Sequence, residues 1–340
     1  MTTTVATESA EDFLSRKTVL TRAQHLLHSH PAFSPAIVLL LSGTAFGLLN
    51  GRFFRPENMS LITQQVAVVG ALAVGQTLII LTAGIDLSVG AIMILSQMIA
   101  AKTAASSGVP APLALLLGIA VGAAAGALNG VLVTRLNLPP FIVTLGTLNV
   151  FTALALLYSS GATVSGPRLP SLLTWTGNAF SIGSVRITYG VIFMLVLYAC
   201  AGYALHNTAW GRHVYAVGDD ADASRLAGIR VNRVLFSVYV AAGVIFALAA
   251  WILIGRVGAA SPNAGGSANL DSITAVVIGG TSLFGGRGTV IGSLLGALIV
   301  GVFRNGLALA GVDALYQTLA VGILVIAAVG IDQWIRKVRA

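Results

Sequence analysis

The sequence has very little charge. Only 9% of its 340 residues are Asp, Glu, Lys or Arg, whereas 56% are hydrophobic and the mean hydropathy is +0.90. Soluble domains usually carry about 25% charged residues, so this chain has too little polar surface to cover a water-exposed globule. The composition excludes an ordinary soluble protein and predicts that the chain lies in lipid.

Cysteine and lysine are also scarce. The single cysteine, Cys200, excludes an intramolecular disulfide and a cysteine cluster for metal. The only lysines are Lys17, Lys102 and Lys337, and none of them follows a glycine. A P-loop needs Gly-Lys followed by Ser or Thr to hold nucleotide phosphates. The chain therefore has no recognisable nucleotide-hydrolysing site of its own.

What the sequence does contain is a series of long apolar runs. A helix that crosses hydrocarbon needs about 20 residues, and the runs do not alternate as the strands of a membrane β-barrel do. We therefore predict an all-α integral membrane protein of about ten transmembrane helices, with a domain over 35–335 preceded by a cytoplasmic segment, 1–34. The runs are about 35–50, 60–83, 86–105, 111–134, 141–160, 187–205, 234–255, 272–281, 289–309 and 315–331, of which the eighth is short.

The cationic residues indicate an orientation. Loops rich in Lys and Arg stay on the cytoplasmic side, and ten crossings put both termini on one side. With cytoplasmic termini, twelve Lys and Arg residues lie inside and six outside, with Arg304 unassigned. We expect both termini in the cytoplasm. This topology also explains the net charge of +8, so the basic residues do not predict a nucleic-acid partner.

The N-terminal segment does not read as a cleavable signal, because it carries Glu8, Glu11 and Asp12 and has no early apolar core. His25, His28 and His30 cluster in it. We interpret them as part of a solvated or headgroup-facing helix, and we predict no metal site.

Glycines lie mostly inside the apolar runs, where small residues let helices approach closely. The GAAAG stretch at 122–126 and the pair Gly292 and Gly296 are of this kind. We interpret them as packing positions.

Two apolar regions are interrupted in a similar way. GIDLSVGAIMILS (84–96) and GGTSLFGGRGTVIGSLLGA (279–297) each join a polar, glycine-flanked break to an apolar helix. They are a weak hint of a two-half internal repeat. Paired broken segments in two halves indicate a transport pathway.

The polar stretch 206–233 contains a predicted short helix. Asp219 or Asp220 can cap it, Asp222 falls in its first turn, and Gly228 suits a left-handed stop. So short a helix is unstable alone and needs a surface to dock on, either on its own protein or on a partner. Its residues are Asp220, Ala221, Asp222, Ala223, Ser224, Arg225, Leu226, Ala227 and Gly228.

Several polar residues in or beside apolar runs are candidates for a pathway. Asp86 lies at the boundary of an apolar run, where a carboxylate is costly unless it is hydrated, paired or capping a helix. We favour a cap of the third helix over a pathway role. The others match sugar hydroxyls in chemistry but can equally bond to helix backbone. They are Ser88, Gln76, Thr144, Thr147 and Asn149.

Four stretches together resemble one family, the membrane permease subunits of ribose-, xylose- and arabinose-type ABC importers. They are GIDLSVG (84–90), PPFIVTLGT (139–147), GRHVYAVGDDADASRLAGI (211–229) and the long glycine-rich stretch 276–307, of which the last two are specific in combination. The resemblance covers about 35–335.

The resemblance implies a permease in the bacterial inner membrane that transports a pentose or a hexose. It implies three protein partners: a second copy of the chain, an ATP-binding subunit and a periplasmic sugar-binding protein. It also implies that ATP binds the partner, with no cofactor on this chain, and that Asp220 to Gly228 form the coupling helix that contacts the ATPase. Where much of the family has Gly-Asn, this chain has Asp219-Asp220, which adds negative charge.

Other classes of protein stay open. An ion-coupled secondary transporter usually carries intramembrane acids or histidines, and here Asp86, Asp271 and Asp313 all lie near segment ends. An enzyme is disfavoured, because the apolar runs hold no HExxH motif and no Ser-His pair. Related ABC permeases for branched-chain amino acids or nucleosides are the nearest alternative.

Overall fold

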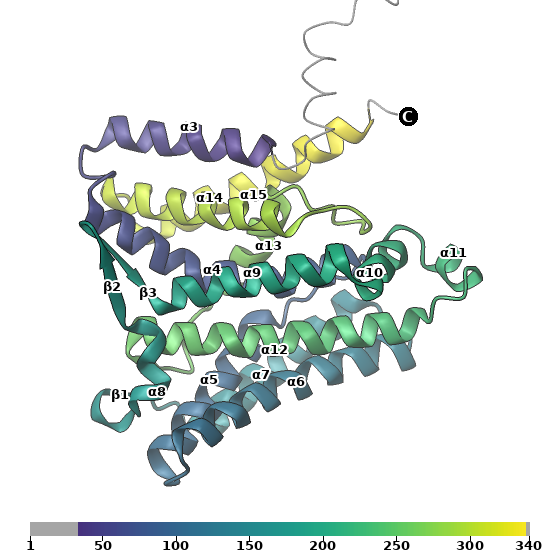
Figure 1. The fold of residues 1–340 in the computed structure, drawn as a ribbon, viewed down its shortest axis with the longest axis horizontal. Helices are drawn as coiled ribbons and strands as arrows, with labels where there is room; N and C mark the ends of the chain where they lie inside the picture. Colours follow the sequence, from purple (N-terminus) through teal and green to yellow (C-terminus); the bar gives the residue numbers. More distant parts are fainter. Residues whose placement is uncertain (1–32, 338–340) are drawn as a thin grey trace, which may run out of the picture.

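The computed structural model describes residues 33–337. Figure 1 shows a bundle of helices that lie roughly along one direction, with α11 (Ala221–Leu226) at one end and the hairpin of β2 (Ala179–Ile182) and β3 (Val185–Thr188) at the other. We call these the α11 end and the hairpin end. The histidines of the N-terminal segment lie outside the described residues.

The long helices match the predicted apolar runs in order and position. The remaining α-helices and strands of the described chain are α3 (Phe33–Leu49), α4 (Pro56–Leu81), α5 (Val89–Ser106), α6 (Ala111–Arg135), α7 (Pro140–Ser159), β1 (Val164–Ser165), α8 (Ser171–Thr174), α9 (Tyr189–Asn207), α10 (Ala209–Asp219), α12 (Val231–Val257), β4 (Ala259–Ala260), α13 (Ala268–Ile278), α14 (Val290–Leu309) and α15 (Ala314–Lys337).

Seven of these helices, α4, α5, α6, α7, α9, α12 and α14, are long and apolar enough to cross a membrane. Three further apolar helical stretches are shorter, namely Phe33–Leu49, Ala268–Ile278 and Ala314–Leu324. The prediction of an all-α integral membrane protein is confirmed, with these ten stretches in the places of the ten runs.

The core of the bundle is built on α4. Within its most apolar window, 83% of α4 is buried in the protein, whereas the windows of α6 and α7 are 28% buried. A helix that is apolar on all sides but covered by protein on only one side meets lipid or another protein with the rest. Helices α6, α7 and α9 therefore surround a centre formed by α4, α5, α12 and α14.

Glycines bring the central helices together, as predicted. A methyl group at Gly126 or Gly243 would collide with the backbone of the facing helix in the α6–α12 pair. Gly292 and Gly296 of α14 meet the backbone of Gly279 and Ala275 in the same way. Both glycine stretches therefore serve close helix packing.

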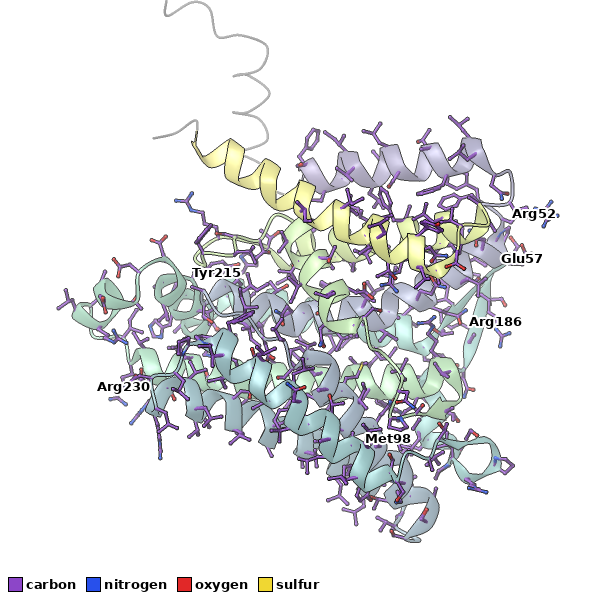
Figure 2. All side chains as sticks on the ribbon, turned by 180° about the vertical axis from the view of Figure 1, so that it is seen from behind. Arg52, Glu57, Met98, Arg186, Tyr215 and Arg230 are labelled. Atoms are coloured by element: carbon purple, nitrogen blue, oxygen red, sulfur yellow. The ribbon has the colours of Figure 1, made fainter. Side chains whose placement is uncertain are left out.

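The polar stretch after α7 forms small structures that the sequence did not predict. β1 pairs with β4, and β2 pairs antiparallel with β3. The backbone N–H of Arg186 in β3 donates to the Ser60 hydroxyl of α4 at 2.9 Å, which ties the hairpin to the start of that helix. Figure 2 shows Arg52, Glu57 and Arg186 together at this end and Arg230 at the α11 end.

Candidate functional site

Helix α11 has the capped form that the sequence predicts. The carboxylate of Asp220 accepts hydrogen bonds from the backbone N–H groups of Asp222 and Ala223, both at 2.9 Å. Gly228 has a φ of +84°, the left-handed conformation that ends a helix and favours glycine. The negative charge of Asp220 also complements the helix N-terminus.

The outer face of α11 is open. Leu226 is 91% exposed, and Ala223, Ala227 and Gly228 are exposed beside it. Only Ser224 is buried toward the protein. The Arg225–Asp222 ion pair at 2.6 Å is exposed, so it contributes little to stability. A helix of six residues is not stable alone, and the apolar tip of α11 is left uncovered by the described part of the chain.

Helix α10, which the sequence did not predict, carries α11. The Thr208 hydroxyl caps it by accepting from the Gly211 N–H at 3.1 Å, and Gly211, Val214, Val217 and Gly218 form its buried face. Because two of these four residues are glycines, the helical period is hard to recognise in sequence. Helix α10 thus lies between α11 and the membrane helices.

The two interrupted segments meet beneath α10. We call residues 82–88 the first break and residues 279–289 the second break. The Gly286 N–H of the second break donates to the carbonyl oxygen of Leu81, the last residue of α4 before the first break, at 3.0 Å. Gly285 packs against Ala83 of the first break. The Tyr215 hydroxyl of α10 donates to the Gly288 carbonyl oxygen at 2.9 Å. Both breaks therefore lie at the α11 end and share contacts with the helix that supports α11.

Asp86 does not cap the third helix, so that prediction is wrong. Helix α5 begins at Val89, and Ser88 occupies its cap position without a side-chain cap bond. Asp86 instead closes a local turn, because its Oδ1 atom accepts from both the N–H and the hydroxyl of Ser88 at 2.6 Å. The Asn129 amide donates to the same hydroxyl at 2.9 Å. The carboxyl is 1% exposed, and burial raises its pKa to about 6.

The other predicted pathway residues do not converge on one site. Thr144 is buried and donates to the Ile85 carbonyl oxygen at 3.0 Å, which fixes α7 to the first break, and Thr147 lies one turn further along. Asn149 is exposed on the outside and bonds to its own helix. Gln76 is fully buried, and its amide has no partner within the described part of the chain.

A cavity of about 310 Å³ lies nearer the hairpin end. Gln65, one of its lining residues, is nine residues after the start of α4, which is about 14 Å along the helix at 1.5 Å per residue. Its deep wall is apolar and includes Met93 and Val300, both almost fully buried. We call it the polar cavity after its remaining side chains, which include Gln65, Arg256, Ser267, Asp271, Arg304 and Gln317.

An ion pair forms one wall of the polar cavity. Arg304 of α14 donates to Asp271 Oδ1 of α13 at 2.6 Å, with side chains that are 32% and 5% exposed. The Ser267 hydroxyl donates to the other carboxylate oxygen at 3.1 Å. Asp271 is buried inside the bundle because α13 is short and follows a loop that enters the bundle beside α5. The side chain of Gln97 in α5 donates to the Ser261 carbonyl oxygen of that loop.

The polar cavity is the site that sequence reasoning missed. One signal was available, since Arg304 lies inside the apolar run 289–309, and an ionisable residue within a membrane span marks a functional site by default. The partner of Arg304 was not readable, because it depends on how the loop before α13 enters the bundle.

Most of the chain matches a known protein family. Residues 58–329 match the protein family described as "Branched-chain amino acid transport system / permease component". No solved structure matches the chain.

Three relatives illustrate the similarity over nearly full length. The fructose import permease protein of Rhizobium meliloti is 53% identical over 342 residues, covering 99% of this chain and 94% of that protein. The ribose import permease protein of Bacillus subtilis is 42% identical, covering 88% of this chain and 92% of that protein. The D-allose transport system permease protein of Escherichia coli is 36% identical, covering 88% and 91%.

Proposed function

This chain belongs to the family of branched-chain amino acid transport system permease components, and we propose that it forms the membrane pathway of an ATP-driven importer for a monosaccharide. The observation that carries the proposal is the nearly full-length similarity to permeases whose names specify fructose, ribose and allose. A pentose or a hexose is therefore the expected cargo, rather than the branched-chain amino acid of the family description.

The chain is a multi-pass membrane protein, and its family is one of transport permease subunits rather than enzymes. Permeases of ABC importers work with ATPase and substrate-binding partners. We place the ATPase at α11, because that helix presents Leu226 on a capped, exposed tip. ATP would bind and be hydrolysed on that partner, and no cofactor is assigned to this chain.

The orientation follows from the same placement. If α11 contacts the ATPase, the α11 end faces the cytoplasm. Helix α3 begins and α15 ends at that end (Figure 1), which supports cytoplasmic termini, as does the distribution of Lys and Arg. The hairpin end then faces the periplasm, and the binding protein docks there.

Two copies of the chain are proposed to form the working unit. Exposed apolar side chains on α3, α7 and α15, such as Leu48, Leu157 and Leu315, are surfaces that either lipid or a second copy would cover. The proposed homodimer rests on the family resemblance.

The described conformation supports a pathway that is closed at the α11 end. There the Gly286–Leu81 bond joins the second break to the end of α4, beside the first break, and α10 packs over this junction, whereas the polar cavity lies toward the hairpin end. An importer in this state would receive sugar from outside before ATP-driven movement of α11 and α10 opened the other end.

Reconstitution tests the proposal directly. The permease, its ATPase and its binding protein are placed in proteoliposomes, and the uptake of labelled pentoses and hexoses is measured with ATP on the ATPase side. Uptake should require ATP and the binding protein and should be insensitive to a protonophore. Uptake by the permease alone, driven by an ion gradient, would replace the proposal with a secondary transporter.

A further inference from the structure

The polar cavity has the size and composition of a binding site for a small polyol. Pockets that hold small molecules begin at about 300 Å³, and this one has about 310 Å³. Met93 and Val300 offer an apolar surface for the C–H groups of a ligand, while Gln65 and Ser267 offer hydrogen-bonding groups on the same cavity.

The ion pair in its wall has unused hydrogen-bonding capacity. A guanidinium has five N–H donors, and Arg304 donates to Asp271 through Nη2 alone, although its side chain is 32% exposed. An ionised pair inside a membrane bundle is expensive and marks a functional position by default. Helix packing alone does not require such a pair, whereas a ligand with several hydroxyl groups can bond to both of its members.

The charge of the cavity favours a neutral ligand over an anion. Asp271 neutralises Arg304 in the wall, and the further cation among the lining residues, Arg256, is exposed in the last turn of α12. A site for a phosphate or a carboxylate would be expected to leave a deep cation unpaired for the ligand.

We propose that the polar cavity is a transit site that binds a neutral monosaccharide through the Asp271–Arg304 pair on its way through the permease. The site deepens the proposed function and depends on it. Its described lining includes no aromatic ring, so the sugar has no stacking platform and is held weakly. Weak binding suits a pathway, because a transported solute must leave the site as readily as it enters.

A cysteine-protection experiment tests the site without relying on transport. Cys200 is replaced by Ala, and a single cysteine is introduced as Ala308→Cys, at an exposed position that lines the cavity. The matched control is Ala310→Cys, exposed two residues later, directly after the end of α14 and outside the cavity lining. The permease–ATPase complex in nanodiscs is labelled with a membrane-impermeant thiol reagent, with and without millimolar monosaccharide.

The expected result is that the transported sugar slows labelling at 308 and leaves labelling at 310 unchanged. A sugar acid of similar size should not protect. Failure to label 308, equal protection at both positions, or protection by the sugar acid alone would each overturn the proposed site. If the wild-type complex still imports sugar, these outcomes reject the site but not the proposed function. If the wild-type complex imports no sugar at all, the proposed function itself is contradicted.

A second variant tests the role of the ion pair. Asp271→Asn combined with Arg304→Gln removes both charges together, so that neither is left buried alone. Protection at 308 should then require a sugar concentration roughly tenfold higher, the loss expected for one hydrogen bond to a charged group, while labelling without sugar stays at its original rate. If the variant is labelled at its original rate and is protected at the same sugar concentration as before, the ion pair does not take part in binding.

Discussion

The backbone N–H of Gly286 lies 3.0 Å from the carbonyl oxygen of Leu81 and donates a hydrogen bond to it, which joins the second break to the end of α4, directly before the first break. These residues are 205 positions apart in sequence, as the numbering shows. Gly218 of α10 packs on both of them. A displacement of α10 would therefore act on the second break and on the end of α4 that leads into the first break, which would give α11 a mechanical route to the proposed pathway.

Gly218→Ala is expected to weaken this route. A methyl group there would stand 2.7 Å from the Gly286 nitrogen and collide with the Leu81 carbonyl, so α10 must move away from the breaks. Overpacking of this kind typically costs about 1–3 kcal/mol. We expect ATP-driven uptake in proteoliposomes to fall several-fold while the variant still assembles with its ATPase.

The control for that change is Gly202→Ala in α9, where an added methyl group meets nothing within 4 Å. This variant should transport like the wild type. If Gly218→Ala also transports normally, the contact between α10 and the breaks does not carry the signal.

Leu226→Asp combined with Ala227→Asp is expected to abolish transport. Both residues are exposed at the tip of α11, so the bundle should fold and insert normally, while two new carboxylates should disrupt the proposed apolar contact with the ATPase. Co-purification of the ATPase and sugar uptake are measured together. Ala209→Asp is the matched control, since it adds a carboxylate at an exposed position in the first turn of α10, and normal transport by the double variant would remove α11 from the coupling role.

The orientation can be checked with two single cysteines in a Cys200→Ala background. Asn207→Cys lies at the α11 end and Ser181→Cys in the hairpin, and both positions are exposed. In spheroplasts, an impermeant maleimide should label position 181 and should reach position 207 only after the membrane is opened. The reverse pattern would put the α11 end outside the cell and would contradict every partner assignment made above.

The sequence predicted the helices well because hydropathy acts locally. A run of about 20 apolar residues must become a helix in lipid, where each backbone polar group needs a partner within its own segment. The cap of α11 was equally readable, since Asp220 bonds to residues two and three positions away. The glycine contacts of α6 and α14 followed from the same local pattern.

Features that depend on distant contacts were less accessible. Asp86 reads as a helix cap, yet α5 begins three residues later and the carboxylate bonds to Ser88 within the break. The pairing of Asp271 with Arg304 spans 33 positions and two helices, and it requires the loop before α13 to enter the bundle. Asn149 has the chemistry of a pathway residue but faces outward. A single polar residue on an apolar helix does not reveal which side of the helix packs against its neighbours.

Asp86→Asn separates a structural role of this residue from a charge role in transport. Burial raises the pKa of Asp86 to about 6 from 3.8, and the residue lies in the first break, outside the spanning helices. The folded state therefore favours the neutral acid, so stability falls as the pH rises from about 4 to 6 and the carboxyl ionises. This difference in pKa corresponds to roughly 3 kcal/mol of stability.

The Asn variant cannot ionise, and its amide oxygen can still accept from Ser88. We therefore expect the melting temperature of the purified protein to fall less between pH 4 and pH 7 in Asp86→Asn than in the wild type, with transport retained. Asp86→Ala should be less stable than Asp86→Asn at both pH values, because it leaves two buried donors of Ser88 without an acceptor, a loss of about 1–3 kcal/mol each. If Asp86→Asn instead loses transport while its stability and expression are normal, the negative charge itself takes part in transport, because shape and hydrogen bonding are otherwise preserved.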